Sequence, residues 1–116
     1  LPVAEIASIK LNVHFAFDSS KVQERYFADI SELADFLKRF SDLQVDVEGH
    51  TDSDGDEAMN QILSEKRAQA VVDQLINLGI DGTRLNSKGW GENKPVSVNN
   101  TSEGKAANRR VEFIRS

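Results

Sequence analysis

The sequence contains no cysteine, only two prolines, and one tryptophan and one tyrosine among its aromatic residues. The absence of cysteine excludes disulfide bonds, thiolate-ligated zinc and thiol chemistry. Long uncharged apolar runs are also missing, and none approaches the roughly 18–20 residues that a membrane-spanning helix requires. Attachment to a membrane would therefore need a segment outside this chain.

Positive charge is scarcer than negative charge. There are 14 Lys and Arg residues against 19 Asp and Glu residues, a formal net charge of -5. Because nucleic-acid affinity arises largely from Lys and Arg displacing counterions, we expect no nucleic-acid partner. What is present, 39% hydrophobic and 28% charged residues over 116 positions, is typical of one globular domain. We expect a single domain over residues 1–116.

Hydrophobic periodicity predicts alternating strands and helices. The expected elements are strands over 9–17 and 43–47, helices over 22–40 and 57–78, and further strands over 85–88 and 109–114. In the first strand, one apolar face is predicted, made of Ile9, Leu11, Val13, Phe15 and Phe17. The order β-α-β-α-β-β predicts an α+β or α/β sandwich with helices packed on one sheet. Residues 91–107 are polar and long for a connection, so we expect a functional surface loop there.

The helix expected over 57–78 carries polar residues on its apolar stripe. Asn60, Ser64 and Arg67 project along the N-terminal half of that stripe, where core residues would be expected. An unpaired buried charge is costly, so Arg67 needs a partner. The first interpretation is an internal Arg67–Asp52 ion pair that fixes the preceding turn. The second is a split site for a zwitterion, in which Asp52 holds a ligand ammonium and Arg67 a ligand carboxylate.

Several separated motifs point in one direction. They are Phe17-Asp18-Ser19-Ser20, Gly49-His50-Thr51-Asp52, Asn60, Leu63-Ser64 with Arg67-Ala68, Gly89-Trp90-Gly91-Glu92 with Pro95, and Asn108-Arg109-Arg110-Val111. Over nearly the whole chain, they resemble the OmpA-like C-terminal domain family, which occurs in OmpA-type outer-membrane proteins, the lipoprotein Pal and the flagellar stator protein MotB. The resemblance implies an α+β fold with helices packed on one mixed four-stranded sheet.

The resemblance also implies a ligand. In that family, the Asp of the first motif and the Arg of the helix motif bind the diaminopimelate residue of the peptidoglycan stem peptide non-covalently. These roles fall on Asp52 and Arg67, which favours the split site over the closed ion pair. Residues that would line or support the pocket are Asp18, Ser19, Thr51, Asn60, Leu63 and Ser64. A Lys-type stem lacks the second carboxylate, which gives a physical basis for discrimination.

The family implies a periplasmic wall anchor without catalytic residues, metal or cofactor. It would be the C-terminal part of a longer envelope protein, attached to the outer membrane through its N-terminal part, and a homodimer is compatible with this. The alternative is an OmpA-like interaction or oligomerisation module that does not bind the wall. Asp54 and Asp56 motivate that alternative, because they make the turn more acidic than is usual in the family.

The same acidic turn suggests two other functions. Asp52, Asp54 and Asp56 have the spacing of calcium ligands, but an EF-hand would require Gly at position 57 and Glu at position 63, and neither is present. A hydrolase built on His50 and Asp52 lacks a nucleophile-elbow motif, and His50 is more simply a hydrogen-bonded structural residue. We therefore expect neither a metal site nor an enzyme.

Two features near the C-terminal half leave alternatives open. The pair Arg109-Arg110 suggests either an anionic partner or, as we favour, a structural role in which one Arg pairs with local carboxylates and the other faces water. Trp90 fits the edge of a loop or the core about equally well.

Overall fold

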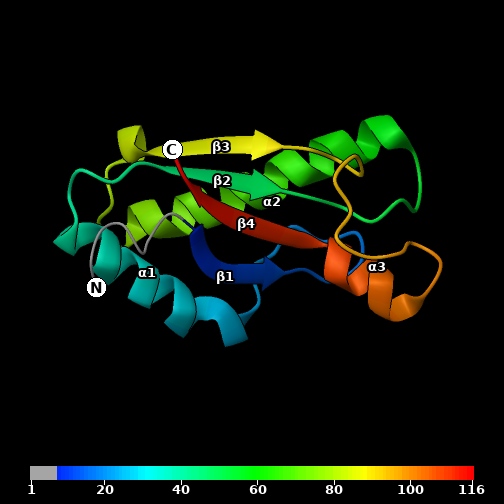
Figure 1. Cartoon of the computed structure of the whole chain (residues 1–116), viewed down its shortest axis with the longest axis horizontal. Helices are drawn as coiled ribbons and strands as arrows, with labels where there is room; N and C mark the ends of the chain where they lie inside the picture. The colour runs from blue at the N-terminus through cyan, green and yellow to red at the C-terminus, as the bar shows by residue number, and fades with distance from the viewer. Residues whose placement is uncertain (1–7) are drawn as a thin grey trace.

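The sheet has four strands in the order β1-β4-β2-β3 (Figure 1). The computed structural model describes the backbone of residues 8–116 and the side chains of residues 11–116. The strands are β1 (Ser8–His14), β2 (Val45–Gly49), β3 (Leu85–Gly89) and β4 (Arg110–Arg115). Strand β4 is antiparallel to both β1 and β2, whereas β2 and β3 are parallel. The predicted mixed four-stranded sheet is confirmed.

Two long helices, α1 (Phe27–Arg39) and α2 (Glu57–Asn77), pack on one face of this sheet. The alternating residues of the strands and the apolar stripes of the helices interdigitate there, as expected for a two-layer α+β fold. The largest fully buried apolar side chains of this core are Phe113, Ile30, Leu37, Leu75, Val13, Val45, Val47, Val71 and Val111. Short 3-10 turns cover Glu24–Tyr26 and Gly82–Arg84. Among the helices of residues 8–116, none has the length and apolar character needed to cross a membrane.

The predicted loop over 91–107 is partly wrong, because it contains a third helix, α3 (Ser102–Asn108), at one end of the sheet (Figure 1). Its N-cap is Thr101, whose hydroxyl accepts a hydrogen bond from the Gly104 N–H at 3.0 Å. The sequence did not predict this helix, because Gly104 lies within it and glycine has a low helical propensity. Its lack of a side chain is required by the fold, since a Cβ there would overlap the Val98 carbonyl oxygen.

The chain leaves β1 earlier than the alternation predicted. Val13 and Phe15 are buried as expected, but β1 ends at His14 and Phe17 is 64% exposed. The reason is a turn after the strand, in which Asp18 adopts a left-handed φ of 54° and the Ser19 N–H donates to the Ala16 carbonyl. The predicted orientation of the Ile9 side chain lies outside the described residues. Helix α1 also starts later than position 22, at Phe27.

Helix α2 lies directly on the end of β2. A Cβ on Gly49, the last residue of β2, would overlap the backbone carbonyl of Ser64, so only glycine permits this approach. At the N-terminus of α2, the Asp56 carboxylate accepts from the Met59 N–H at 3.1 Å, which is a typical N-cap. The close contact and the cap together place the N-terminal half of α2 over the end of β2.

Candidate functional site

A cavity of about 190 Å³ opens where the N-terminal half of α2 meets the chain segments that follow β1 and β2. Carboxylates, guanidinium groups and apolar side chains all contribute to its walls. Its lining residues are Phe17, Asp18, Thr51, Asp52, Asp54, Gly55, Asp56, Met59, Asn60, Leu63, Arg67 and Arg109. Six of the eight predicted site residues therefore meet in one place.

The other two predicted residues support the cavity without lining it. The backbone carbonyl of Ser19 accepts from Arg67 Nε at 2.8 Å. The Ser64 hydroxyl donates to the Gln61 carbonyl at 2.7 Å and accepts from the Gly91 N–H at 2.9 Å. Ser19 thus holds a cavity residue in place, and Ser64 joins α2 to the segment after β3.

Arg67 is fully buried at the floor of the cavity and donates to three backbone carbonyls. These belong to Ser19 at 2.8 Å, His50 at 2.9 Å and Ala16 at 3.2 Å. Burial is the main reason why the pKa of Arg67 is lowered to about 10. The negative charge of Asp52 raises this pKa, and the positive charge of Arg109 lowers it further. Arg67 therefore remains protonated at neutral pH and joins the segment after β1 to the end of β2.

Asp52 is 3% exposed and has a different partner from Arg67. Its Oδ2 lies 3.2 Å from Arg109 Nη1, and its Oδ1 accepts from the Asp54 N–H at 3.0 Å. None of the salt bridges within residues 8–116 involves Arg67. The direct Arg67–Asp52 ion pair of the first interpretation is therefore not formed in the described part of the chain.

The acidic turn is held from several sides. Asn60 Nδ2 donates to the Asp54 carbonyl at 3.0 Å and to Glu92 Oε1 at 3.1 Å, and the Thr51 hydroxyl donates to the Asp52 carbonyl at 2.7 Å. Lys105 of α3 lies 3.3 Å from the Asp54 carboxylate. In the portion of the chain that the structure describes, no group of three or more His, Asp or Glu side chains is arranged to hold a metal ion.

Arg109 is the basic residue of the cavity that sequence reasoning did not assign to the site. It follows α3 directly, and its Nε donates to the Phe15 carbonyl at 2.9 Å. The sequence predicts that one residue of the pair Arg109-Arg110 pairs with a local carboxylate. Both residues bind a carboxylate: Arg110 binds Glu112, two residues away, whereas Arg109 binds Asp52, which lies 57 residues away in the sequence. Two signals in the sequence could have found it: Arg109 belongs to one of the motifs that carry the family resemblance, and neighbouring residues at the start of a strand point to opposite faces of the sheet.

The prediction that the other Arg faces water is wrong, because Arg110 is 2% exposed. Besides Glu112 Oε1 at 3.2 Å, it donates to the backbone carbonyls of Asn108 at 3.1 Å and Lys94 at 2.9 Å. The segment containing Lys94 folds back over this end of the sheet. The fold thus buries Arg110 on the face opposite α2.

His50 does not line the cavity, although it precedes Thr51 and Asp52. Its side chain is 1% exposed, and neither ring nitrogen has a hydrogen-bond partner among the described residues. The Glu112 carboxylate oxygen Oε2 lies 3.5 Å from Nε2. Burial, followed by the positive charge of Arg110, lowers the pKa of His50 to about 4. The ring is therefore neutral at pH 7. The expectation of a hydrogen-bonded residue holds for its backbone, not for its ring.

Trp90 lies at a loop edge and is not part of the core. Its Nε1 donates to Glu48 Oε1 at 2.9 Å, and the ammonium groups of Lys88 and Lys94 lie 4.0 Å and 3.5 Å from the ring centroid. This environment settles the alternative left open by the sequence in favour of the amphipathic loop position.

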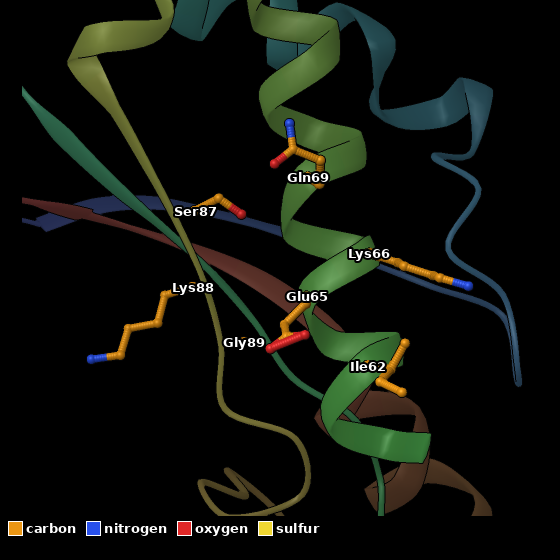
Figure 2. A pocket seen from close by; sticks show the side chains of 7 residues that line it. All are labelled: Ile62, Glu65, Lys66, Gln69, Ser87, Lys88 and Gly89. Atoms are coloured by element: carbon orange, nitrogen blue, oxygen red, sulfur yellow. The ribbon is translucent and has the colours of Figure 1, made fainter. Parts of the chain in front are cut away.

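A second hollow, of about 650 Å³, lies between α2 and the edge strand β3. Figure 2 shows the Lys66 and Lys88 side chains extending away from it in opposite directions, while Glu65 reaches towards Gly89. Its polar side chains are exposed and do not converge on one point. The smaller cavity, with its buried Asp52 and Arg67, is therefore the candidate binding site.

Comparison with known proteins agrees with this fold and with these motifs. The OmpA family model matches residues 14–109. Outer membrane porin F of Pseudomonas aeruginosa is 54% identical over 111 residues, which cover 95% of this chain and 32% of that protein. The chain spans about a third of the length of the first curated relatives that it matches.

Solved structures show the same architecture. The peptidoglycan-associated lipoprotein from Burkholderia pseudomallei is 33% identical with a TM-score of 0.90, covering 92% of this chain and 91% of that one. The cell wall anchor of the T6SS from Pseudomonas aeruginosa is 32% identical with a TM-score of 0.76, covering 90% and 79%. With the family model matching most of its length, the chain belongs to the OmpA family.

Proposed function

We propose that this chain is a non-catalytic cell-wall-binding domain, which holds the diaminopimelate-containing stem peptide of peptidoglycan in the cavity around Asp52 and Arg67. The observation that supports this most is that a buried carboxylate, Asp52, and a buried guanidinium, Arg67, line the same cavity without a bond between them. Two similar solved structures are a peptidoglycan-associated lipoprotein and a cell wall anchor, which supports a role at the wall.

Each end of the ligand would find a charged partner. A guanidinium has five N–H donors, and its three bonds to backbone carbonyls leave Arg67 with two donors for a ligand carboxylate. Asp52 would accept from the ligand ammonium, with Asp18 at the rim. Thr51 and Asn60 would shape the acidic side of the cavity, and Leu63 would form part of its apolar wall. Ser19 would hold Arg67 in place, and Ser64 would hold α2 against the segment after β3.

The expected affinity of one site is moderate, because a hydrogen bond to a charged group contributes only about 1.5–3 kcal/mol net. Many copies beside a polymeric wall would add avidity, and a homodimer would increase it further. We propose that residues 1–116 act as one domain of a longer periplasmic envelope protein. The rest of that protein would attach it to the outer membrane. The similarity to porin F, a much longer outer-membrane protein, supports this location.

The test is an NMR titration of the domain with a muropeptide that contains meso-diaminopimelate. We expect saturable shifts around Asp18, Asp52 and Arg67, which Asp52→Asn abolishes. Asp73→Asn is the control, because Asp73 is exposed on α2, outside the cavity, and its carboxylate accepts a hydrogen bond from Gln69. A muropeptide with Lys at the same stem position should bind more weakly, since it lacks the second carboxylate.

Absence of shifts in the folded wild-type domain would overturn wall binding. The remaining function would then be the OmpA-like interaction or oligomerisation module, and its surface would be sought outside the cavity.

A further inference from the structure

Arg109 lies at the mouth of the cavity, whereas Arg67 forms its floor. The Arg109 side chain is 18% exposed, while Arg67 is fully buried. Two donors of Arg109 are committed, Nε to the Phe15 carbonyl at 2.9 Å and Nη1 to Asp52 Oδ2 at 3.2 Å. Arg109 is therefore anchored on its inner side, and its position is set before any ligand arrives.

The outer side of the Arg109 guanidinium retains donor capacity. Across residues 8–116, no acceptor is bonded to its Nη2, which carries two N–H groups. Arg67, in contrast, has a backbone acceptor on each of its three nitrogens. More free donors thus remain at the mouth of the cavity than at its floor.

Two guanidinium groups share this cavity close to a single buried carboxylate. The positive charge of Arg109 helps to lower the pKa of Arg67, and within residues 8–116 Asp52 is the only acid that bonds to either Arg. An anionic group between them would offset this repulsion. A carboxylate suits the position, because its two oxygens can accept from two N–H donors at once, whereas a carboxamide offers one oxygen and carries no charge.

We propose that Arg109 is a second carboxylate-binding residue of the cavity, and that the cavity therefore selects ligands whose zwitterionic end carries a free carboxylate over those in which it is a carboxamide. The inference rests on the proposed function and deepens it, since it adds a specificity-determining residue and narrows the class of stem peptide.

The experiment compares two muropeptides by calorimetry, one with the free diaminopimelate carboxylate and one with that carboxylate amidated. Each is titrated into wild type, Arg109→Gln and the control Arg115→Gln, which removes one exposed charge from the far end of β4. We expect Arg109→Gln to reduce the ratio of the affinity for the free acid to the affinity for the amide by about fivefold or more. The affinity for the amide itself should change little. Arg115→Gln should retain the wild-type preference.

Equal losses for the free acid and the amide in Arg109→Gln would overturn the inference, because Arg109 would then act only by holding Asp52. If Arg109→Gln does not fold, Arg109→Lys serves in its place, since it keeps the charge and loses the Nη2 donors. Failure of the wild type to bind either muropeptide would overturn the proposed function and this inference with it. Binding by wild type with an unchanged preference in the variants would overturn the inference alone.

Discussion

Asp52 is paired with Arg109 at 3.2 Å, not with Arg67, although all three residues line the same cavity. Arg67 instead donates to three backbone carbonyls from segments that lie far apart in the sequence. Arg67 is consequently a structural residue as well as a candidate ligand contact. Loss of binding on its substitution must therefore be separated from loss of fold.

Arg67→Ala should lower the free energy of unfolding by about 3–5 kcal/mol, because it leaves buried carbonyls without donors and opens space at the cavity floor. Urea unfolding followed by circular dichroism measures this. Arg115→Ala is the control, since Arg115 is exposed, and it should change stability by less than about 0.5 kcal/mol. A similar small change for Arg67→Ala would contradict the structural role.

Gly49→Ala should destabilise the domain by roughly 3 kcal/mol, because the added methyl group would force the Ser64 turn of α2 off the sheet. Gly55→Ala provides the comparison. Gly55 has a positive φ of 86° but no neighbour within 4 Å of an added Cβ, so its substitution costs only the backbone strain of about 1–2 kcal/mol. Thermal unfolding should rank the two variants in this order, and the reverse order would refute the close approach.

Acid should weaken the fold through His50. Its pKa in the folded state is lowered from 6.5 to about 4, so the unfolded chain binds the proton more tightly. The contribution of the neutral ring to the free energy of unfolding is fully present above pH 6.5 and is lost as the pH falls from 6.5 towards 4. We expect His50→Leu to remove roughly 3 kcal/mol of the acid-dependent loss in the free energy of unfolding over this range, measured by urea unfolding at each pH.

The matched variant for this experiment is His14→Leu, which removes the other histidine of the chain. It should retain the acid-dependent loss, because His50 is still present. An unchanged pH profile in His50→Leu would mean that the buried ring does not resist protonation.

Asn108→Ala should release the segment before α3. Asn108 is fully buried; its Oδ1 accepts from the Val96 and Ser97 N–H groups, and its Nδ2 donates to the Ser97 carbonyl and to Asn99 Oδ1. We expect a loss of about 2–3 kcal/mol and faster proteolysis within 95–100. Asn100→Ala, at an exposed position, is the control. Equal proteolysis rates for the two variants would show that Asn108 does not hold the segment.

Local periodicity was sufficient to predict much of the fold. Helix α2 starts at Glu57 as predicted and ends at Asn77, one residue from the expected end. The apolar stripe with polar interruptions correctly indicated that Asn60, Ser64 and Arg67 are buried. These features depend on the 3.6-residue and 2-residue repeats of helices and strands, which a sequence displays directly.

The partners of the charged groups were decided by the tertiary structure alone. Asp52 and Arg109 are 57 residues apart, and the carbonyls bound by Arg67 include two that lie 48 and 51 residues before it. No local pattern encodes such distances, because they follow from the order of the strands and from the turn that carries Phe17 away from the core. The sequence by itself determined that Asn60, Ser64 and Arg67 of α2 are buried, because the helical repeat places them on the apolar stripe. Only the packing of β1, β4 and α2 decided that Arg109 would meet Asp52 and that Arg67 would bind the backbone.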